Sequence, residues 1–138
     1  ERGDRYLEQL SDGERRNLYR CQSLIDQGVN VAVSSDAPYG PISPWGVIKH
    51  STERVTKSGA VVGEVERISA STALRSYLTS KGDPAGEVRQ VQVGSAADLC
   101  LLDRPLSEAL KTPYAVSVVA TLIDGSPTHG LQIDGRGV

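Results

Sequence analysis

An alternating apolar run that ends in a single carboxylate constrains the fold of this 138-residue chain more than any other feature. Residues 29–33 read Val-Asn-Val-Ala-Val, and Ser34-Ser35-Asp36-Ala37-Pro38 follows directly. This pattern predicts a short buried strand over 29–34, ended by a Pro-rich loop. In parallel α/β sheets and barrels, ligands bind at the carboxyl ends of strands, so Asp36 is the first candidate site residue. The alternative is a turn aspartate that binds the amides of its own loop.

Capping residues and helical spacing predict helices on both sides of this strand. Ser11 and Glu14 form a capping box, and apolar residues continue at helical spacing as far as Gly28. Two further helices are expected to begin at Ser43, with Val55 still on the apolar face, and at Ser69. They should end near 57–59 and at 81–84. A helix that leads through one glycine into a strand is typical of repeating βα units.

The pattern changes at about residue 85 to short β segments separated by turns. Strands are predicted over 87–93, 99–102 and 116–123, with a turn at Asp124-Gly125. Leu99-Cys100-Leu101-Leu102 is apolar without alternation, so both of its faces should be covered. We therefore predict an α/β fold with a boundary between residues 1–83 and 84–138.

Composition excludes several classes of partner. Lys and Arg number 15 against 17 Asp and Glu, both signs are interspersed, and the net charge is −2, which argues against a nucleic-acid or acidic-membrane partner. No apolar run approaches the roughly 18 residues of a membrane span, so a soluble, cytoplasmic protein is expected. The two cysteines, Cys21 and Cys100, are predicted to be buried free thiols.

The usual complete catalytic sites are absent from the sequence. His50 and His129 have no second ligand at metal-binding spacing and are predicted to be structural or solvent-facing. Neither a phosphate-binding glycine loop nor a Gly-x-Ser-x-Gly elbow occurs. Tyr39 and Trp45 flank the loop after Asp36 and are either the walls of a substrate pocket or packing between that loop and the next helix.

Several short motifs in a fixed order carry a resemblance that covers nearly the whole chain. They are Gly28 to Pro38, Pro44-Trp45, Ile68-Ser69 with Ala73-Leu74, Gly94 with Ala97-Asp98-Leu99 and Leu102-Asp103, and Ile123-Asp124-Gly125. In this order they resemble the C-terminal third of a metal-dependent amidohydrolase, in the subgroup that contains N-substituted formamide deformylases. The segment 1–6 is similar to the part that follows the seventh barrel strand there. One departure is Val93, where the family usually has proline.

The resemblance implies the last βα units of a (β/α)8 TIM-like barrel in 1–83 and part of a small β-sandwich domain in 84–138. It also implies hydrolysis of a non-peptide C–N bond in a small amide-type substrate. The aspartate matching Asp36 would contact a divalent metal, expected to be zinc, and act as general base and then general acid.

The family's His-x-His, its bridging Lys or Glu and its two later histidines would all precede Glu1. The chain is therefore expected to be an inactive C-terminal fragment that holds no metal by itself, since zinc usually needs about three protein ligands. Because the predicted strand would lack its neighbours in such a fragment, the chain could also associate with copies of itself, so a homo-oligomer is a further expectation. The alternative to an enzyme fragment is a non-catalytic, β-rich assembly or binding module.

Overall fold

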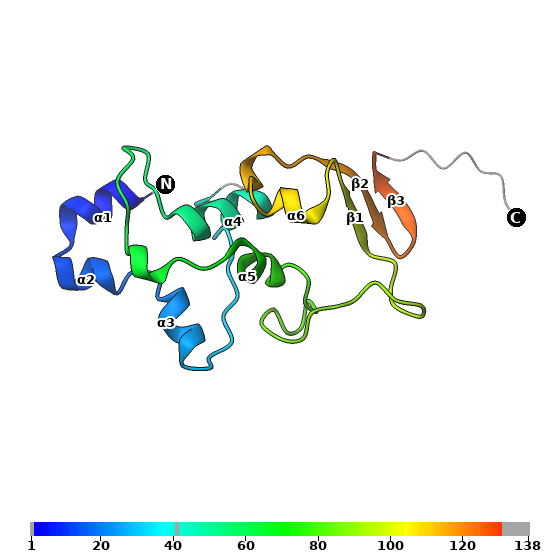
Figure 1. The fold of residues 1–138 in the computed structure, drawn as a ribbon, viewed down its shortest axis with the longest axis horizontal. Coiled ribbons are helices and arrows are strands. Elements are labelled where there is room, and N and C mark those ends of the chain that lie inside the picture. The colour runs from blue at the N-terminus through cyan, green and yellow to red at the C-terminus, as the bar shows by residue number, and fades with distance from the viewer. Residues whose placement is uncertain (1, 41, 131–138) are drawn as a thin grey trace, which may run out of the picture. The chain divides into compact units, whose positions relative to one another are not determined.

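The computed structural model describes residues 2–40 and 42–130, and the chain divides into two compact units, Glu1–Arg89 and Gln90–Val138 (Figure 1). The first unit contains α1 (Gly3–Gln9), α2 (Asp12–Arg16), α3 (Cys21–Asp26), α4 (Pro44–Glu53), the 3-10 turn η1 (Glu64–Glu66) and α5 (Ala70–Arg75). The second contains β1 (Leu99–Leu102), α6 (Leu106–Ala109), η2 (Pro113–Ala115), β2 (Val118–Ile123) and β3 (Ser126–His129). No helix among the described residues is long and apolar enough to cross a membrane.

The three predicted helix starts are confirmed by side-chain caps. Ser11 and Glu14 form a complete capping box at α2. The hydroxyl of Ser43 accepts from the Gly46 amide at α4, and that of Ser69 accepts from the Thr72 amide at α5. Each capping hydrogen bond joins residues three positions apart, so local sequence is sufficient to specify it.

The single helix predicted between Ser11 and Gly28 is wrong. Two short helices, α2 and α3, occur instead, and the chain between them turns through Tyr19, which has a left-handed φ of 51°. Gly28, at φ 78°, does end α3 as predicted. The later helices also end early, α4 at Glu53 and α5 at Arg75, so Val55 lies beyond α4 and pairs with Val61 in an isolated β-bridge.

The strand predicted over 29–34 does not form among the described residues. Burial still alternates along the segment, since Val31 and Val33 are half-buried while Ala32 and Ser34 are exposed. A strand requires a neighbour to accept and donate its ladder hydrogen bonds, and the described part of this unit offers none. The Val33 amide donates instead to Oγ of Ser76, at 3.1 Å. The parallel barrel units that the resemblance implies are therefore not seen here.

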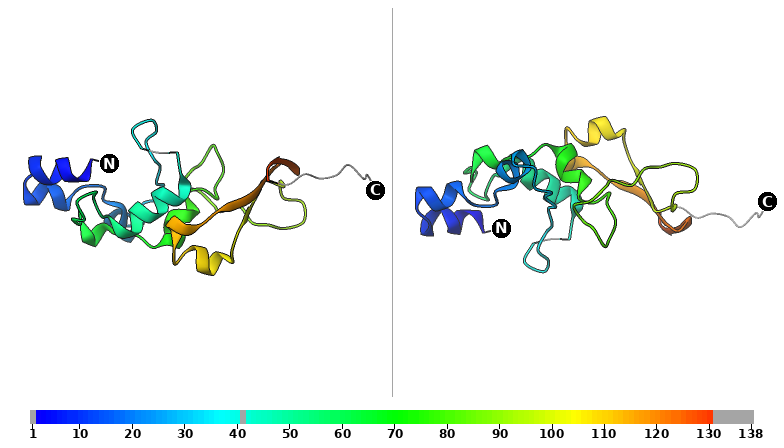
Figure 2. Two further views of the ribbon diagram at one scale, coloured as in Figure 1. Left: turned by 90° about the horizontal axis from the view of Figure 1, so that it is seen from above. Right: turned by 90° about the horizontal axis from the view of Figure 1, so that it is seen from below.

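The core of the first unit lies between α4 and α5, which run side by side in Figures 1 and 2. Ile48, Ile68 and Ala73 are buried there. Trp45 and Val33 pack against this cluster. The core therefore ties the segment before Asp36 to both helices.

The second unit is an antiparallel sheet in the order β1-β2-β3. Leu99 pairs with Leu122, and Asp124 and Gly125 form the predicted turn between β2 and β3 with φ values of 49° and 74°. The strand predicted over 87–93 is wrong, because that segment is irregular. The α/β class is confirmed. Within residues 2–40 and 42–130, strands form this one antiparallel sheet.

Two predictions about burial in β1 are also wrong. Leu101 is 52% exposed and Cys100 is exposed, so neither face of the strand is fully covered. Three strands and two single-turn helices provide too little surface to cover a sheet on both sides. Cys21 is half-buried, and both cysteines are free.

Candidate functional site

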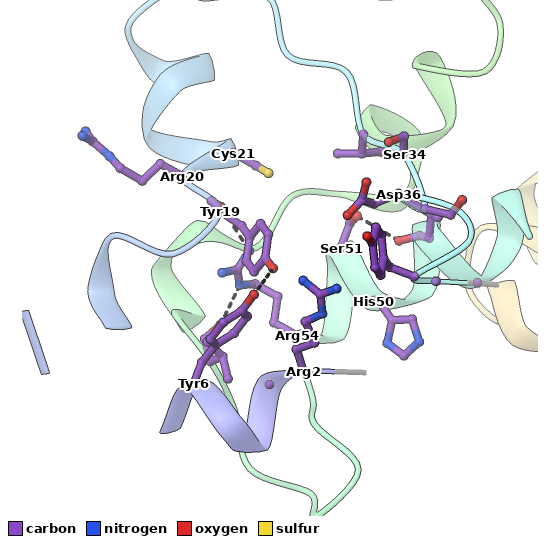
Figure 3. Close-up of a pocket in the computed structure, with 18 of the residues that line it drawn as sticks. Arg2, Tyr6, Tyr19, Arg20, Cys21, Ser34, Asp36, His50, Ser51 and Arg54 are labelled. Carbon is purple, nitrogen blue, oxygen red and sulfur yellow. Dashed lines mark hydrogen bonds between the residues drawn. The ribbon is translucent and has the colours of Figure 1, made fainter. Parts of the chain in front are cut away.

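A cavity of about 700 Å³ in the first unit contains Asp36 in its lining (Figure 3). Four segments line it: the start of α1, residues 19–24, residues 31–40, and α4 with the chain that follows it. Figure 3 shows Tyr6 and Tyr19 on one side of the cavity and Asp36 with Ser34 on the other. The cavity therefore brings together residues far apart in sequence around one carboxylate.

Asp36 is exposed and follows the half-buried residues Val31 and Val33. Its backbone is left-handed, at φ 52°, and its carbonyl oxygen accepts from the Tyr39 amide at 2.9 Å. A Cβ at Gly40 would overlap the Ser35 carbonyl oxygen, so only glycine fits this tight turn. Among the described residues no group donates a hydrogen bond to the Asp36 carboxylate. The turn is built from backbone groups, and the carboxylate is left available to the cavity.

Tyr6 and Tyr19 form a coupled pair at the wall of the cavity. Their ring centroids are 6.3 Å apart at an interplanar angle of 57°, and the Tyr19 hydroxyl donates to the Tyr6 hydroxyl at 3.5 Å. This hydrogen bond and partial burial raise the pKa of Tyr19 to about 12. The pKa of Tyr6 is lowered by its hydrogen bonds with Tyr19 and Arg2. Tyr19 therefore stays protonated and remains a hydrogen-bond donor at neutral pH.

Arg54 fixes the backbone beside this pair. Its Nη2 donates to the Leu18 carbonyl at 2.7 Å, its Nη1 to the Tyr19 carbonyl at 3.2 Å, and its Nε to the Val62 carbonyl at 2.7 Å. Burial lowers the pKa of the guanidinium below its usual value, but that value is so high that the group stays charged. The three hydrogen bonds to carbonyl oxygens offset part of the desolvation penalty of burying this cation.

The two aromatic residues predicted near Asp36 have different positions. Tyr39 lines the cavity, and the guanidinium carbon of Arg2 lies 4.6 Å from its ring centroid in a cation–π contact. Trp45 packs against the core of the unit and is not among the residues that line the cavity. The described geometry thus gives Tyr39 a place at the candidate site and Trp45 a place in the packing of α4.

A buried carboxylate joins two other elements of the same unit. Glu66 is 5% exposed, and its Oε2 accepts from the Ser23 amide in the first turn of α3 at 2.9 Å. This backbone hydrogen bond, assisted by the charges of Arg20 and Arg54, holds the pKa of Glu66 below its usual value, against the opposing effect of burial. Glu66 is therefore a structural anion that attaches η1 to α3.

The described residues do not form a metal centre by themselves. His50 and Cys21 line the same cavity as Asp36, whereas His129 lies in β3 of the second unit. No group of three His, Cys, Asp or Glu side chains within 2–40 and 42–130 is arranged to hold a metal ion. A zinc site usually needs about three protein ligands, so this donor set does not fit one.

Sequence reasoning missed Tyr6, Tyr19 and Arg54. The sequence predicts a continuous helix through Tyr19, because Leu18-Tyr19-Arg20 contains no glycine or proline to signal a break. The break depends on Arg54, which is 35 residues away in the sequence. No local signal could have identified it.

Comparison with known proteins points to one family. A family model described as the amidohydrolase family matches residues 4–129. The chain is 32% identical over 116 residues to N-substituted formamide deformylase from Arthrobacter pascens, an alignment that covers 81% of this chain and 21% of that protein. The chain thus spans about a fifth of the length of that relative. No solved structure matches it.

Proposed function

We propose, because this chain belongs to the amidohydrolase family, that it is part of an enzyme that hydrolyses a non-peptide C–N bond in a small amide-type molecule. N-substituted formamides are the first substrate class to test, since the relative is named for them. We assign residues 1–83 to the last βα units of a (β/α)8 barrel and residues 84–138 to part of an accessory β-sandwich. The remaining active-site residues would come from other parts of a longer protein.

The availability of the Asp36 carboxylate is the observation that carries this proposal. The carboxylate is exposed at the cavity, and no described group occupies its oxygens. In hydrolysis it would accept a proton from the water whose oxygen bonds to the amide carbon. It would then return that proton to the nitrogen as the C–N bond breaks, giving a carboxylic acid and an amine. Tyr39 would form an apolar wall beside the substrate.

A divalent metal, which we expect to be zinc, would belong to the complete site of the longer protein, with Asp36 as its contact from this chain. Such an ion increases the acidity of a water molecule bound to it. The described residues do not complete a metal centre. The step that this chain would carry out itself is proton transfer at Asp36.

Asp36→Asn in the full-length enzyme tests the assignment. The amide keeps the size of the side chain but cannot take up the proton, so kcat should fall by about 10²- to 10⁴-fold while the melting temperature stays within a few degrees. Asp26→Asn is a matched control, since Asp26 is also exposed but accepts from Gln22 on its own helix, outside the cavity lining. A near-normal kcat with a lowered melting temperature would show that Asp36 only stabilises its turn.

A non-catalytic assembly module remains the competing function, and the exposed apolar side chains of β1 favour it. Exposed apolar strands are common in surfaces that bind another protein. The two functions differ in what the parent gene must encode. An upstream His-x-His motif in that gene would support the enzyme, and a gene that encodes only the β-rich part with its helical extension would support the module.

A further inference from the structure

Unusual backbone conformations are concentrated around the cavity. Of the four non-glycine residues with positive φ in 2–40 and 42–130, Tyr19, Asp36 and Arg54 line it, at 51°, 52° and 52°. The fourth, Asp124, occupies the turn between β2 and β3, where such a conformation is ordinary. Arg54 is the C-cap of α4, where a left-handed residue is ordinary, and aspartate tolerates this conformation, so Tyr19 is the residue whose backbone needs an explanation. Strained residues of this kind occur preferentially at functional sites.

Tyr19 lies outside the buried core of the unit. Its side chain is 61% exposed, so it contributes little to a core. Its backbone is nevertheless fixed, because its carbonyl oxygen accepts from Arg54 and from the Cys21 amide, at 3.2 and 2.7 Å. The structure thus constrains the main chain of Tyr19 while presenting its phenol to the cavity.

The hydrogen bond that the Tyr19 hydroxyl makes to Tyr6 is weak. Its 3.5 Å hydrogen bond to Tyr6 is long, since hydroxyl pairs usually lie about 2.7–2.8 Å apart. The charge of Asp36 makes the smallest of the contributions that raise the pKa of Tyr19. A protonated phenol faces a carboxylate over a space of about 700 Å³.

We propose that the Tyr19 hydroxyl donates a hydrogen bond to the carbonyl oxygen of the amide substrate, and that Arg54 is the positioning residue that aims it. This inference rests on the proposed function, because it places the substrate between Asp36 and Tyr19. As water adds to the carbonyl carbon, negative charge develops on the oxygen, and a fixed neutral donor stabilises that charge. The hydroxyl keeps its proton, and no bond to Tyr19 forms or breaks.

Tyr19→Phe in the full-length enzyme, assayed with an N-substituted formamide by release of formate, tests the inference. This change removes only the hydroxyl, so the melting temperature should stay within a few degrees. We expect kcat/KM to fall by about 10²-fold or more, with most of the loss in kcat, because the hydrogen bond strengthens in the transition state. Tyr114→Phe is the matched control, since Tyr114 is 67% exposed and lies in the other unit.

Arg54→Lys tests the positioning role. Lysine keeps the charge but lacks the planar set of donors that binds three carbonyls, so kcat should fall with little change in KM. If the Arg54 variant does not fold, the Tyr19→Phe result alone decides.

The outcomes separate the two proposals. Wild-type kcat/KM in Tyr19→Phe together with an inactive Asp36→Asn enzyme would overturn the assignment of Tyr19 and leave the proposed function intact. An equal loss in Tyr114→Phe would also overturn it, because a non-specific effect would then explain both losses. If the unaltered enzyme hydrolyses neither N-substituted formamides nor other small amides, the proposed function fails and the assignment of Tyr19 fails with it.

Discussion

Glu66→Gln should destabilise the helical unit at neutral pH and have little effect in acid. The carboxylate is 5% exposed and accepts from the Ser23 amide at 2.9 Å. Gln keeps a carbonyl acceptor of the same size but loses the charge. A hydrogen bond to a charged group contributes about 1.5–3 kcal/mol and a neutral one about 0.5–1.5 kcal/mol, so the difference should be about 1–2 kcal/mol.

The sign of the pH dependence follows from the lowered pKa of Glu66. In the unfolded chain this carboxyl should titrate near the usual value of about 4.3, so at mildly acidic pH the unfolded state binds more protons than the folded state. The stabilisation is therefore complete above that pH and is lost as the pH falls through the lower pKa of the folded state. In the fully protonated range Glu66 is neutral like Gln, and the two proteins should be equally stable.

Urea unfolding of the full chain from about pH 7 to about pH 2 measures this difference. Trp45, the single tryptophan, packs against the core of the same unit and reports its unfolding by fluorescence. Glu64→Gln is the matched control, because Glu64 lies in the same turn but is exposed and forms an ion pair with Arg67. Its loss should cost less than about 1 kcal/mol. An equal effect of Glu66→Gln at both ends of the pH range would refute the reasoning.

Two further predictions concern metal and thiol chemistry. Equilibrium dialysis of the chain against zinc, followed by metal analysis, should find less than one tightly bound ion per chain. The reason is that the described residues contain no group of three ligands arranged to hold a metal ion. One tightly held ion per chain would contradict this prediction. A thiol reagent should modify exposed Cys100 faster than half-buried Cys21, because burial raises the pKa of the Cys21 thiol. Mass spectrometry of the partially labelled chain measures the order of modification, and faster labelling of Cys21 would contradict the prediction.

Features specified by neighbouring residues were predictable from the sequence, and features specified by distant contacts were not. The caps at Ser11, Ser43 and Ser69 need only the next three residues, and β1 and the turn at Asp124-Gly125 follow from short local patterns. The break at Tyr19 depends on a guanidinium from the end of α4. Local sequence therefore predicts where α2, α4 and α5 begin, whereas of the predicted helix ends the structure confirms the one at Gly28.

The strand predicted over 29–34 shows a second limit, because a strand depends on its neighbours. The alternation of Val31 and Val33 is real and directs both side chains inward. Backbone pairing needs a second strand, which the described part of this unit does not supply. The chain spans about a fifth of its relative, so partner strands in a longer protein would be consistent with the pattern.

The geometry at Asp36 favours a role beyond the turn in which it lies. A left-handed residue is accommodated with least strain by glycine, and the hydrogen bond of this turn joins the Asp36 carbonyl to the Tyr39 amide. The turn as described therefore uses the backbone of Asp36 and not its carboxylate. We propose that this carboxylate, which its own loop does not use and which lies at the cavity that Tyr19 also lines, takes part in chemistry in that cavity.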